Sequence, residues 1–104
     1  MILVDEPRWY ERSPTDQHVW CHMVTDGDSF DELHGIAKLI GLKQEWFQGD
    51  HYDLVPSKRA MALKYGAVAV SARALVQRRL RKDGTHGVPK LNLKLPEDWM
   101  KGRP

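Results

Sequence analysis

Three polar residues interrupt segments that are otherwise largely apolar. His22 lies in the run 18–25, and His51 and Asp53 lie in the short run 51–55. Alternate residues of a strand point to the same face, so we expect His51 and Asp53 to be neighbours. Imidazole and carboxylate side chains serve as general acids, general bases and metal ligands. Their place on core-forming segments therefore indicates a candidate site.

A further histidine, His34, extends this candidate site. Apolar residues recur every three or four positions over 30–40, which predicts an amphipathic helix with His34 at the edge of its apolar face. Each histidine alone fits a structural role with a satisfied hydrogen bond. Three histidines and an aspartate on neighbouring elements exceed what packing requires, so we expect all four to share one pocket.

The segment Ser57-Lys58-Arg59 opens a predicted helix over 56–65 and is a candidate phosphate site. Free N–H groups at a helix N-terminus attract anions, and the hydroxyl, ammonium and guanidinium add phosphate-binding groups. The segment lacks the glycines of a P-loop, which argues against that type of nucleotide chemistry. The alternative is a serine cap followed by two solvated cations. Trp46, in the preceding loop, could cover either a nucleobase or the edge of the core.

Aspartates after the first two predicted strands suggest a metal site. Ligands collect beyond the carboxyl ends of strands in open α/β sheets, so Asp5, Asp26 and Asp53 could hold Mg²⁺ or Mn²⁺. The alternative is that they form turns and helix caps. Cys21 and His22 cannot chelate one ion together, because adjacent strand residues point to opposite faces. Cys21 is expected to be a buried structural thiol.

The candidate site residues lie in a predicted α/β domain over residues 1–84. We expect a two-layer or small three-layer arrangement with about four core strands, partly parallel, two or three helices, and an undetermined strand order. The predicted strands are 1–4, 18–25, 51–55 and 67–70, and the predicted helices are 29–40, 56–65 and 71–82. Residues 9–16 are expected to form a loop. Ser29 and Glu32 match a capping box at the start of the first helix.

The composition indicates a small globular protein. The 104 residues include 41% hydrophobic and 29% charged side chains, which favours a packed core over disorder. A single cysteine excludes an intramolecular disulfide, and no apolar run approaches the roughly 20 residues needed to cross a bilayer. The start turns acidic at Asp5, unlike a signal sequence. We therefore expect a cytoplasmic protein.

Charge is divided unevenly along the chain. Residues 1–56 carry four Lys and Arg against eleven Asp and Glu, and residues 57–104 carry twelve against three. The halves could neutralise each other, or the basic half could bind phosphates. The run Arg78 to Lys82 predicts either a nucleic-acid contact or a solvated helix face. Residues 85–104 are expected to form an extension, in which 90–95 alternates like an edge strand and could support dimerisation. The oligomeric state stays open.

Several short motifs follow one another in an order that resembles a known family. They are Val4-Asp5, Cys21-His22-Met23, Glu32-Leu33-His34, Gly41-Leu42, Trp46-Phe47-Gln48, His51-Tyr52-Asp53, Ser57-Lys58-Arg59 and Gly66-Ala67. Over roughly residues 1–72 the chain resembles a family of bacterial and phage proteins known as domain of unknown function 4031. The resemblance implies a compact cytoplasmic protein, of a bacterium or of a phage-infected cell, and implies no activity. The basic stretch after Ser71 is expected to lie outside it.

Three functions stay open. The first is binding of a small phosphate-bearing, nucleotide-like ligand, for sequestration or sensing. Its pocket would consist of His22, His34, His51, Asp53 and Arg59, with Ser57 and Lys58 at the rim and Trp46 over the base. The second is phosphodiester hydrolysis, either by paired histidines among His22, His34 and His51 or by an aspartate-held divalent ion. The third is an accessory module that binds nucleic acid or protein through the basic helix.

Overall fold

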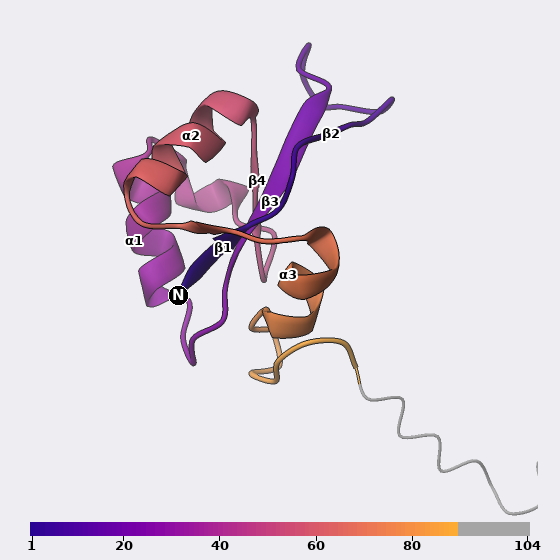
Figure 1. The fold of residues 1–104 in the computed structure, drawn as a ribbon. Helices are drawn as coiled ribbons and strands as arrows, with labels where there is room; N and C mark the ends of the chain where they lie inside the picture. Colours follow the sequence, from indigo (N-terminus) through magenta and orange to yellow (C-terminus); the bar gives the residue numbers. More distant parts are fainter. Residues whose placement is uncertain (90–104) are drawn as a thin grey trace, which may run out of the picture.

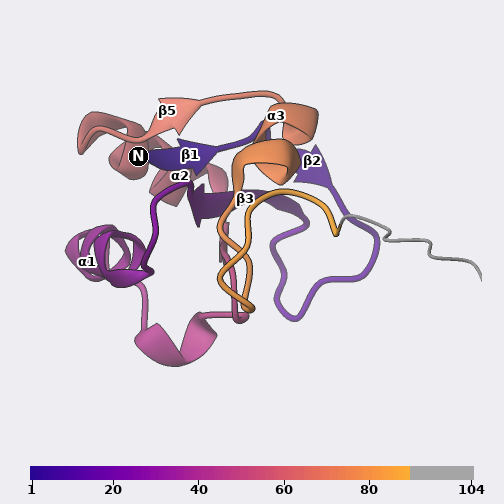
Figure 2. The same cartoon turned by 90° about the horizontal axis from the view of Figure 1, so that it is seen from below.

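Over residues 1–89, which the computed structural model describes, the chain forms a five-stranded sheet with three helices on its two faces (Figures 1 and 2). The strands are β1 (Ile2–Val4), β2 (Arg8–Trp9), β3 (Val19–Thr25), β4 (Tyr52–Leu54) and β5 (Val68–Ala69). The helices are α1 (Asp31–Leu39), α2 (Pro56–Lys64) and α3 (Ala72–Arg78), with a short 3₁₀ helix, η1, at Gln44–Trp46. The predicted α/β class is confirmed, with parallel and antiparallel pairs in one sheet. Within this range, no helix is long and apolar enough to cross a membrane.

The long strand β3 is the centre of the sheet. On one side it pairs antiparallel with β4, which places His22 opposite Asp53. On its other side it pairs antiparallel with β1 and β2, and β5 lies parallel to β1 at the edge. Side chains directly opposite each other in an antiparallel pair share a face. The sheet register therefore brings His22 and Asp53 together.

The sheet separates a large core from a small one. The large core lies against α1 and α2 and contains twelve buried residues, namely Ile2, Val4, Cys21, Met23, Leu33, Ile36, Ala37, Ile40, Tyr52, Leu54, Ala62 and Ala67. The small core lies against α3 and contains the buried residues Leu3, Val24 and Leu75. The short helix α3 covers only part of its face of the sheet (Figure 2). On the rest of that face, His22, His51 and Asp53 are consequently only half-buried.

The start of α1 and the end of α3 differ from the predicted helix ends. The capping box is not formed, because Ser29 Oγ accepts from the Asp31 amide at 3.1 Å and the helix starts two residues later than expected. The third helix ends at Arg78 rather than at residue 82. The Leu80 amide donates to the Thr25 carbonyl at 2.7 Å, and Leu80 forms an isolated antiparallel β-bridge with His86. These bonds attach the chain to the end of β3, so the helix cannot continue.

Two strands also differ from the predictions. The predicted loop 9–16 begins inside β2, where Trp9 pairs with Val19. The strand predicted over 67–70 forms as β5, but its two residues are exposed because, among the described strands, it pairs only with β1 at the edge of the sheet. The edge strand predicted over 90–95 lies outside the described residues.

Candidate functional site

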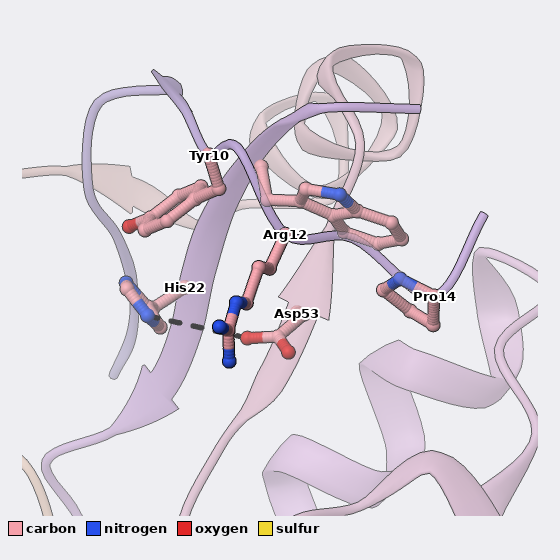
Figure 3. Close-up of a pocket in the computed structure, with 6 residues that line it drawn as sticks. Tyr10, Arg12, Pro14, His22 and Asp53 are labelled. Carbon is pink, nitrogen blue, oxygen red and sulfur yellow. Dashed lines mark ion pairs between the residues drawn. The ribbon is translucent and has the colours of Figure 1, made fainter. Parts of the chain in front are cut away.

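His22, His51 and Asp53 form a compact cluster on the α3 face. His22 comes from the middle of β3, Asp53 from β4, and His51 immediately precedes β4. The Asp53 Oδ1 atom lies 4.0 Å from His22 Nε2 and 3.4 Å from His51 Nε2. One ligand atom from each residue lies within 4.8 Å of the others. Two imidazole nitrogens therefore face the same carboxylate oxygen (Figure 3 shows His22 and Asp53).

Asp5 fixes the orientation of His22 from the other side of its ring. Val4 pairs with Met23 and Arg8 pairs with Trp20. Between these two pairs the segment from β1 to β2 advances four residues, whereas β3 advances only three. The extra residue makes a bulge, which redirects side chains. The buried Asp5 carboxylate accepts the His22 amide at 2.6 Å and contacts His22 Nδ1 at 2.9 Å.

The ionisation of Asp5 follows from these contacts. Burial raises the pKa of Asp5, but hydrogen bonds from the ring and amide of His22 outweigh it, and the pKa lies below its ordinary value. Asp5 is thus a buried carboxylate, which favours a proton on His22 Nδ1.

Asp50 orients the His51 ring, as Asp5 orients the ring of His22. Its Oδ1 atom lies 2.6 Å from His51 Nδ1, and its Oδ2 atom lies 3.5 Å from the Arg79 guanidinium of the segment that follows α3. The hydrogen bond to Asp53 raises the pKa of His51 above its ordinary value, burial opposes the shift, and the bond to Asp50 adds to it. Gln48 donates its amide to the other oxygen of Asp53. Both histidines are therefore oriented by carboxylates at Nδ1 and face Asp53 with Nε2.

This arrangement of charges needs a cation. When Nδ1 donates its proton to a carboxylate, a neutral imidazole presents a bare lone pair at Nε2. Both Nε2 lone pairs would then face the negative oxygen of Asp53. Burial raises the pKa of Asp53, but the hydrogen bond and charge of His51 lower it below its ordinary value, so the carboxylate is ionised. Either a proton on Nε2 or a metal ion between the three residues balances the site.

Two cavities meet at this cluster. The first has a volume of about 180 Å³ and is shown in Figure 3; its walls are formed by Tyr10, Arg12, Pro14, Trp20, His22 and Asp53. The second, of about 170 Å³, includes Asp5, Arg8, His51 and Arg79 among its walls and shares Tyr10 and His22 with the first. The candidate site is consequently reached from a cleft that is lined with arginines.

His34 lies on the opposite face of the sheet. Its Nδ1 atom is 2.8 Å from the hydroxyl of Tyr52, and its ring packs edge-on against Phe47 at 4.6 Å between centroids. Tyr52 and Phe47 belong to the core under α1. The structure therefore does not bring His34 to the other two histidines. Trp46 is 50% exposed in η1 and is not among the residues that line the two cavities.

The basic residues of α2 are engaged in backbone contacts. Lys58 Nζ donates to the Ile40 carbonyl at 2.6 Å, at the end of α1, and Arg59 Nε donates to the Asp5 carbonyl at 2.8 Å. Ser57 is exposed. None of the three lines either cavity. The structure thus places Lys58 and Arg59 as supports of the fold, with Arg59 holding the chain at Asp5.

The three aspartates predicted to share a metal do not converge. Asp5 and Asp53 contact opposite nitrogens of the His22 ring. Asp26 follows β3, roughly 13 Å along the strand from His22 at about 3.3 Å per residue, and pairs with Arg78 at 2.6 Å. A metal held by the cluster would have two nitrogen ligands and Asp53.

The thiol of Cys21 lies in the large core, where burial, and secondly the charge of Asp5, raise its pKa to about 12. It is therefore protonated at neutral pH and a poor nucleophile.

Several residues of the site were not predicted from the sequence. They are Arg8, Arg12, Trp20, Gln48 and Asp50. Tyr10 was expected either to cover a core edge or to stack on a ligand, and Arg79 belongs to the run predicted to contact nucleic acid or solvent. Arg8, Tyr10 and Arg12 alternate along the chain, and this spacing was an available signal for one shared face. Nothing local in the sequence indicates that Arg79 reaches Asp50, because that contact depends on where α3 packs.

Together, the fold and the cluster define a small α/β protein with a half-buried His/Asp site on the α3 face of its sheet. The model of the family described as "Protein of unknown function (DUF4031)" matches residues 2–82, and the chain belongs to this family. The predicted family is thereby confirmed, and the match extends through α3, which was expected to lie outside it. No curated protein and no solved structure matches the chain.

Proposed function

We propose that the protein binds one divalent metal ion through His22, His51 and Asp53 and uses it to hydrolyse a phosphate ester. The observation that carries the proposal is the approach of both histidine Nε2 atoms to Asp53 Oδ1, at 4.0 and 3.4 Å, while a carboxylate holds each Nδ1. Metal-binding histidines characteristically donate their other N–H to a carboxylate or a carbonyl, which orients the ring and makes Nε2 more basic.

The donor set indicates the kind of metal. Two imidazoles and one carboxylate suit Zn²⁺, Mn²⁺ or Fe²⁺ better than Mg²⁺, which prefers oxygen ligands. Three protein ligands leave coordination positions open, as in catalytic rather than structural sites. A metal bound there would supply a water of lowered pKa and an electrophile for a phosphoryl oxygen.

Phosphate esters are the substrates that the surrounding charges favour. Arg8 and Arg12 line the two cavities next to the cluster, and the guanidinium fork matches phosphate oxygens. In the reaction, water loses a proton and forms the new P–O bond, the P–O bond to the alcohol breaks, and the alcohol leaves with a proton.

Two other functions would use much of the same cluster. In one, the protein only binds a nucleotide-like ligand and releases it intact. In the other, His22 and His51 act as general base and acid without a metal. We favour the metal-dependent reaction because Asp53 stands between the two Nε2 atoms, where it would compete with a substrate for their protons.

Metal reconstitution tests the proposal. Protein stripped with a chelator is titrated with Zn²⁺, Mn²⁺ or Mg²⁺, bound metal is measured by native mass spectrometry, and hydrolysis is followed with bis(p-nitrophenyl) phosphate and p-nitrophenyl phosphate. We expect a single equivalent of Zn²⁺ or Mn²⁺ and turnover that a chelator abolishes. His51→Ala and Asp53→Asn should lose both properties. His34→Gln, on the other face, is the matched control and should retain them.

The other outcomes separate the alternatives. Turnover that survives the chelator but is lost in His22→Ala would favour acid–base catalysis. A released nucleotide that emerges intact from purified protein, with no turnover, would favour a binding function. Circular dichroism of each variant checks that it is folded.

A further inference from the structure

Both cavities adjoin the proposed metal ligands. Asp53 lines the first and His51 lines the second, while His22 and Tyr10 line both. The volumes are similar, at about 180 and 170 Å³. A phosphate bound at the cluster would therefore have room for an organic group on each of two ester oxygens.

The first cavity offers flat surfaces next to a guanidinium. Tyr10, Trp20 and Pro14 form its apolar walls, and Arg12 extends over it beside His22 and Asp53 (Figure 3). Aromatic side chains stack on nucleobases without strong sequence preference, and arginine binds the adjoining phosphates. The Trp20 indole N–H is already bonded to Ser13 Oγ at 3.1 Å, which fixes that ring in place.

The second cavity combines two arginines with mainly aliphatic walls. Arg8 and Arg79 line it together with the apolar side chains of Val24, Leu75 and Val76. Among the described residues, no carboxylate lies within 4.0 Å of Arg8 or Arg12. Both arginines are exposed. They are therefore available for anionic groups, Arg12 in the first cavity and Arg8 in the second.

We infer that the substrate is a single-stranded nucleic acid that crosses the cleft, with one phosphodiester at the His22–Asp53 pair and a nucleoside in each cavity. The inference rests on the proposed hydrolase and names its substrate class. Arg8 and Arg12, two residues to either side of Tyr10, would hold the neighbouring phosphates.

The observations favour this substrate over three others. A phosphomonoester would occupy only one cavity. Bases of a duplex are stacked and paired, so they could not enter separate cavities without being flipped out. Binding through the run Arg78 to Lys82 is disfavoured because Arg78 and Arg79 are paired with Asp26 and Asp50.

Equilibrium binding tests the inference without requiring turnover. Fluorescein-labelled oligothymidylate and oligouridylate of about eight nucleotides are titrated with protein in a chelator, and fluorescence anisotropy is followed against salt. We expect Arg8→Gln and Arg12→Gln each to weaken binding roughly tenfold and to reduce the slope of log affinity against log salt by about 0.7. Tyr10→Ala should weaken binding roughly tenfold through lost stacking. The two oligonucleotides distinguish DNA from RNA, and preferential binding of either one supports the inference.

Matched controls make the result decisive. Arg73→Gln removes the same charge from an exposed position that lines neither cavity, and it should change affinity by about twofold at most. Tighter binding of a duplex, or a larger loss in Arg78→Gln than in Arg12→Gln, would overturn the inference.

The hydrolase and its substrate can also fail separately. Metal-dependent hydrolysis of bis(p-nitrophenyl) phosphate, with no oligonucleotide binding, would leave the hydrolase standing and overturn the nucleic-acid substrate. Oligonucleotide binding that depends on Arg12 and Tyr10, without any turnover, would support nucleic acid as the ligand and overturn the hydrolase.

Discussion

The two faces of the sheet hold their histidines in different ways. Under α1, His34 contacts a neutral hydroxyl on Tyr52 and packs against Phe47. On the α3 face, His22 and His51 each contact a carboxylate at Nδ1 and a shared carboxylate oxygen at Nε2. A histidine with a neutral partner can complete its hydrogen bonds without a cation, whereas two histidines among three carboxylates cannot. The comparison shows that partners, rather than burial, distinguish a structural histidine from a candidate ligand.

The largest expected effect concerns packing. Leu33→Ala opens a cavity in the core of twelve buried residues and should lower the free energy of unfolding by about 2–5 kcal/mol. Leu75→Ala acts on the core of three buried residues beside an open cleft, where water and neighbouring side chains can fill the space. Its cost should lie near 2 kcal/mol, at the lower end of that range. Urea unfolding of both variants measures the difference, and a larger cost for Leu75→Ala would contradict the division into a main and a minor core.

The next effect concerns the carboxylates that orient the histidines. Asp5→Asn keeps an oxygen for the His22 amide but places an NH₂ group against His22 Nδ1, so the ring should protonate at Nε2 instead. We expect metal affinity to fall by about 10–100-fold, measured by competition with a chromophoric chelator. Asp50→Asn should act in the same way through His51.

Asp83→Asn is the control for both, because Asp83 is exposed in the turn after α3 and pairs only with Arg81 among the described ion pairs. Unchanged affinity in Asp5→Asn would argue that His22 is not a ligand.

Local sequence patterns correctly predicted which side chains within one strand share a face of the sheet. The alternation in the run 18–25 placed Cys21 and Met23 on one face and His22 on the other, as observed in β3. The spacing of His51 and Asp53 likewise placed both on one side. These successes depend on the strict two-residue period of a strand, which needs no knowledge of the neighbouring elements.

The sequence could not show which elements face each other. His34 lies on a correctly predicted helix, but α1 packs on the opposite face from His22, and no local pattern chooses the face. Lys58 and Arg59 have the right chemistry for phosphate, yet the packing of α2 turns them to the carbonyls of Ile40 and Asp5. Long-range packing therefore decided which predicted residues share a site.

A smaller effect tests the neutral histidine partner. Tyr52→Phe removes the hydroxyl that lies 2.8 Å from His34 Nδ1 and should lower the free energy of unfolding by about 0.5–1.5 kcal/mol. Metal affinity should not change, because the hydroxyl lies on the far face of the sheet from Asp53. Urea unfolding and the same chelator competition measure the two properties. A loss of metal affinity without loss of structure would mean that the faces are coupled.

The smallest effect concerns how α3 is attached to the sheet. Arg78 on α3 pairs with Asp26 at 2.6 Å, in a partly exposed site that also holds the N-terminal ammonium. Burial raises the pKa of Asp26, but hydrogen bonds from the ammonium and from Arg78 lower it below its ordinary value. A carboxyl group with a lowered folded-state pKa stabilises the fold above its unfolded pKa and loses that stabilisation as pH falls through the folded pKa.

Asp26→Asn should therefore cost up to about 1 kcal/mol near neutral pH, and the difference from wild type should decline as pH falls through the lowered folded-state pKa of Asp26. Urea unfolding at a series of pH values measures this difference, and about 1 M salt should reduce it because exposed charges are screened. The cost of Leu75→Ala, which buries no charge, should stay constant over the same pH range. A pH-independent cost for Asp26→Asn would mean that the ion pair between Arg78 and Asp26 does not help to hold α3 on the sheet.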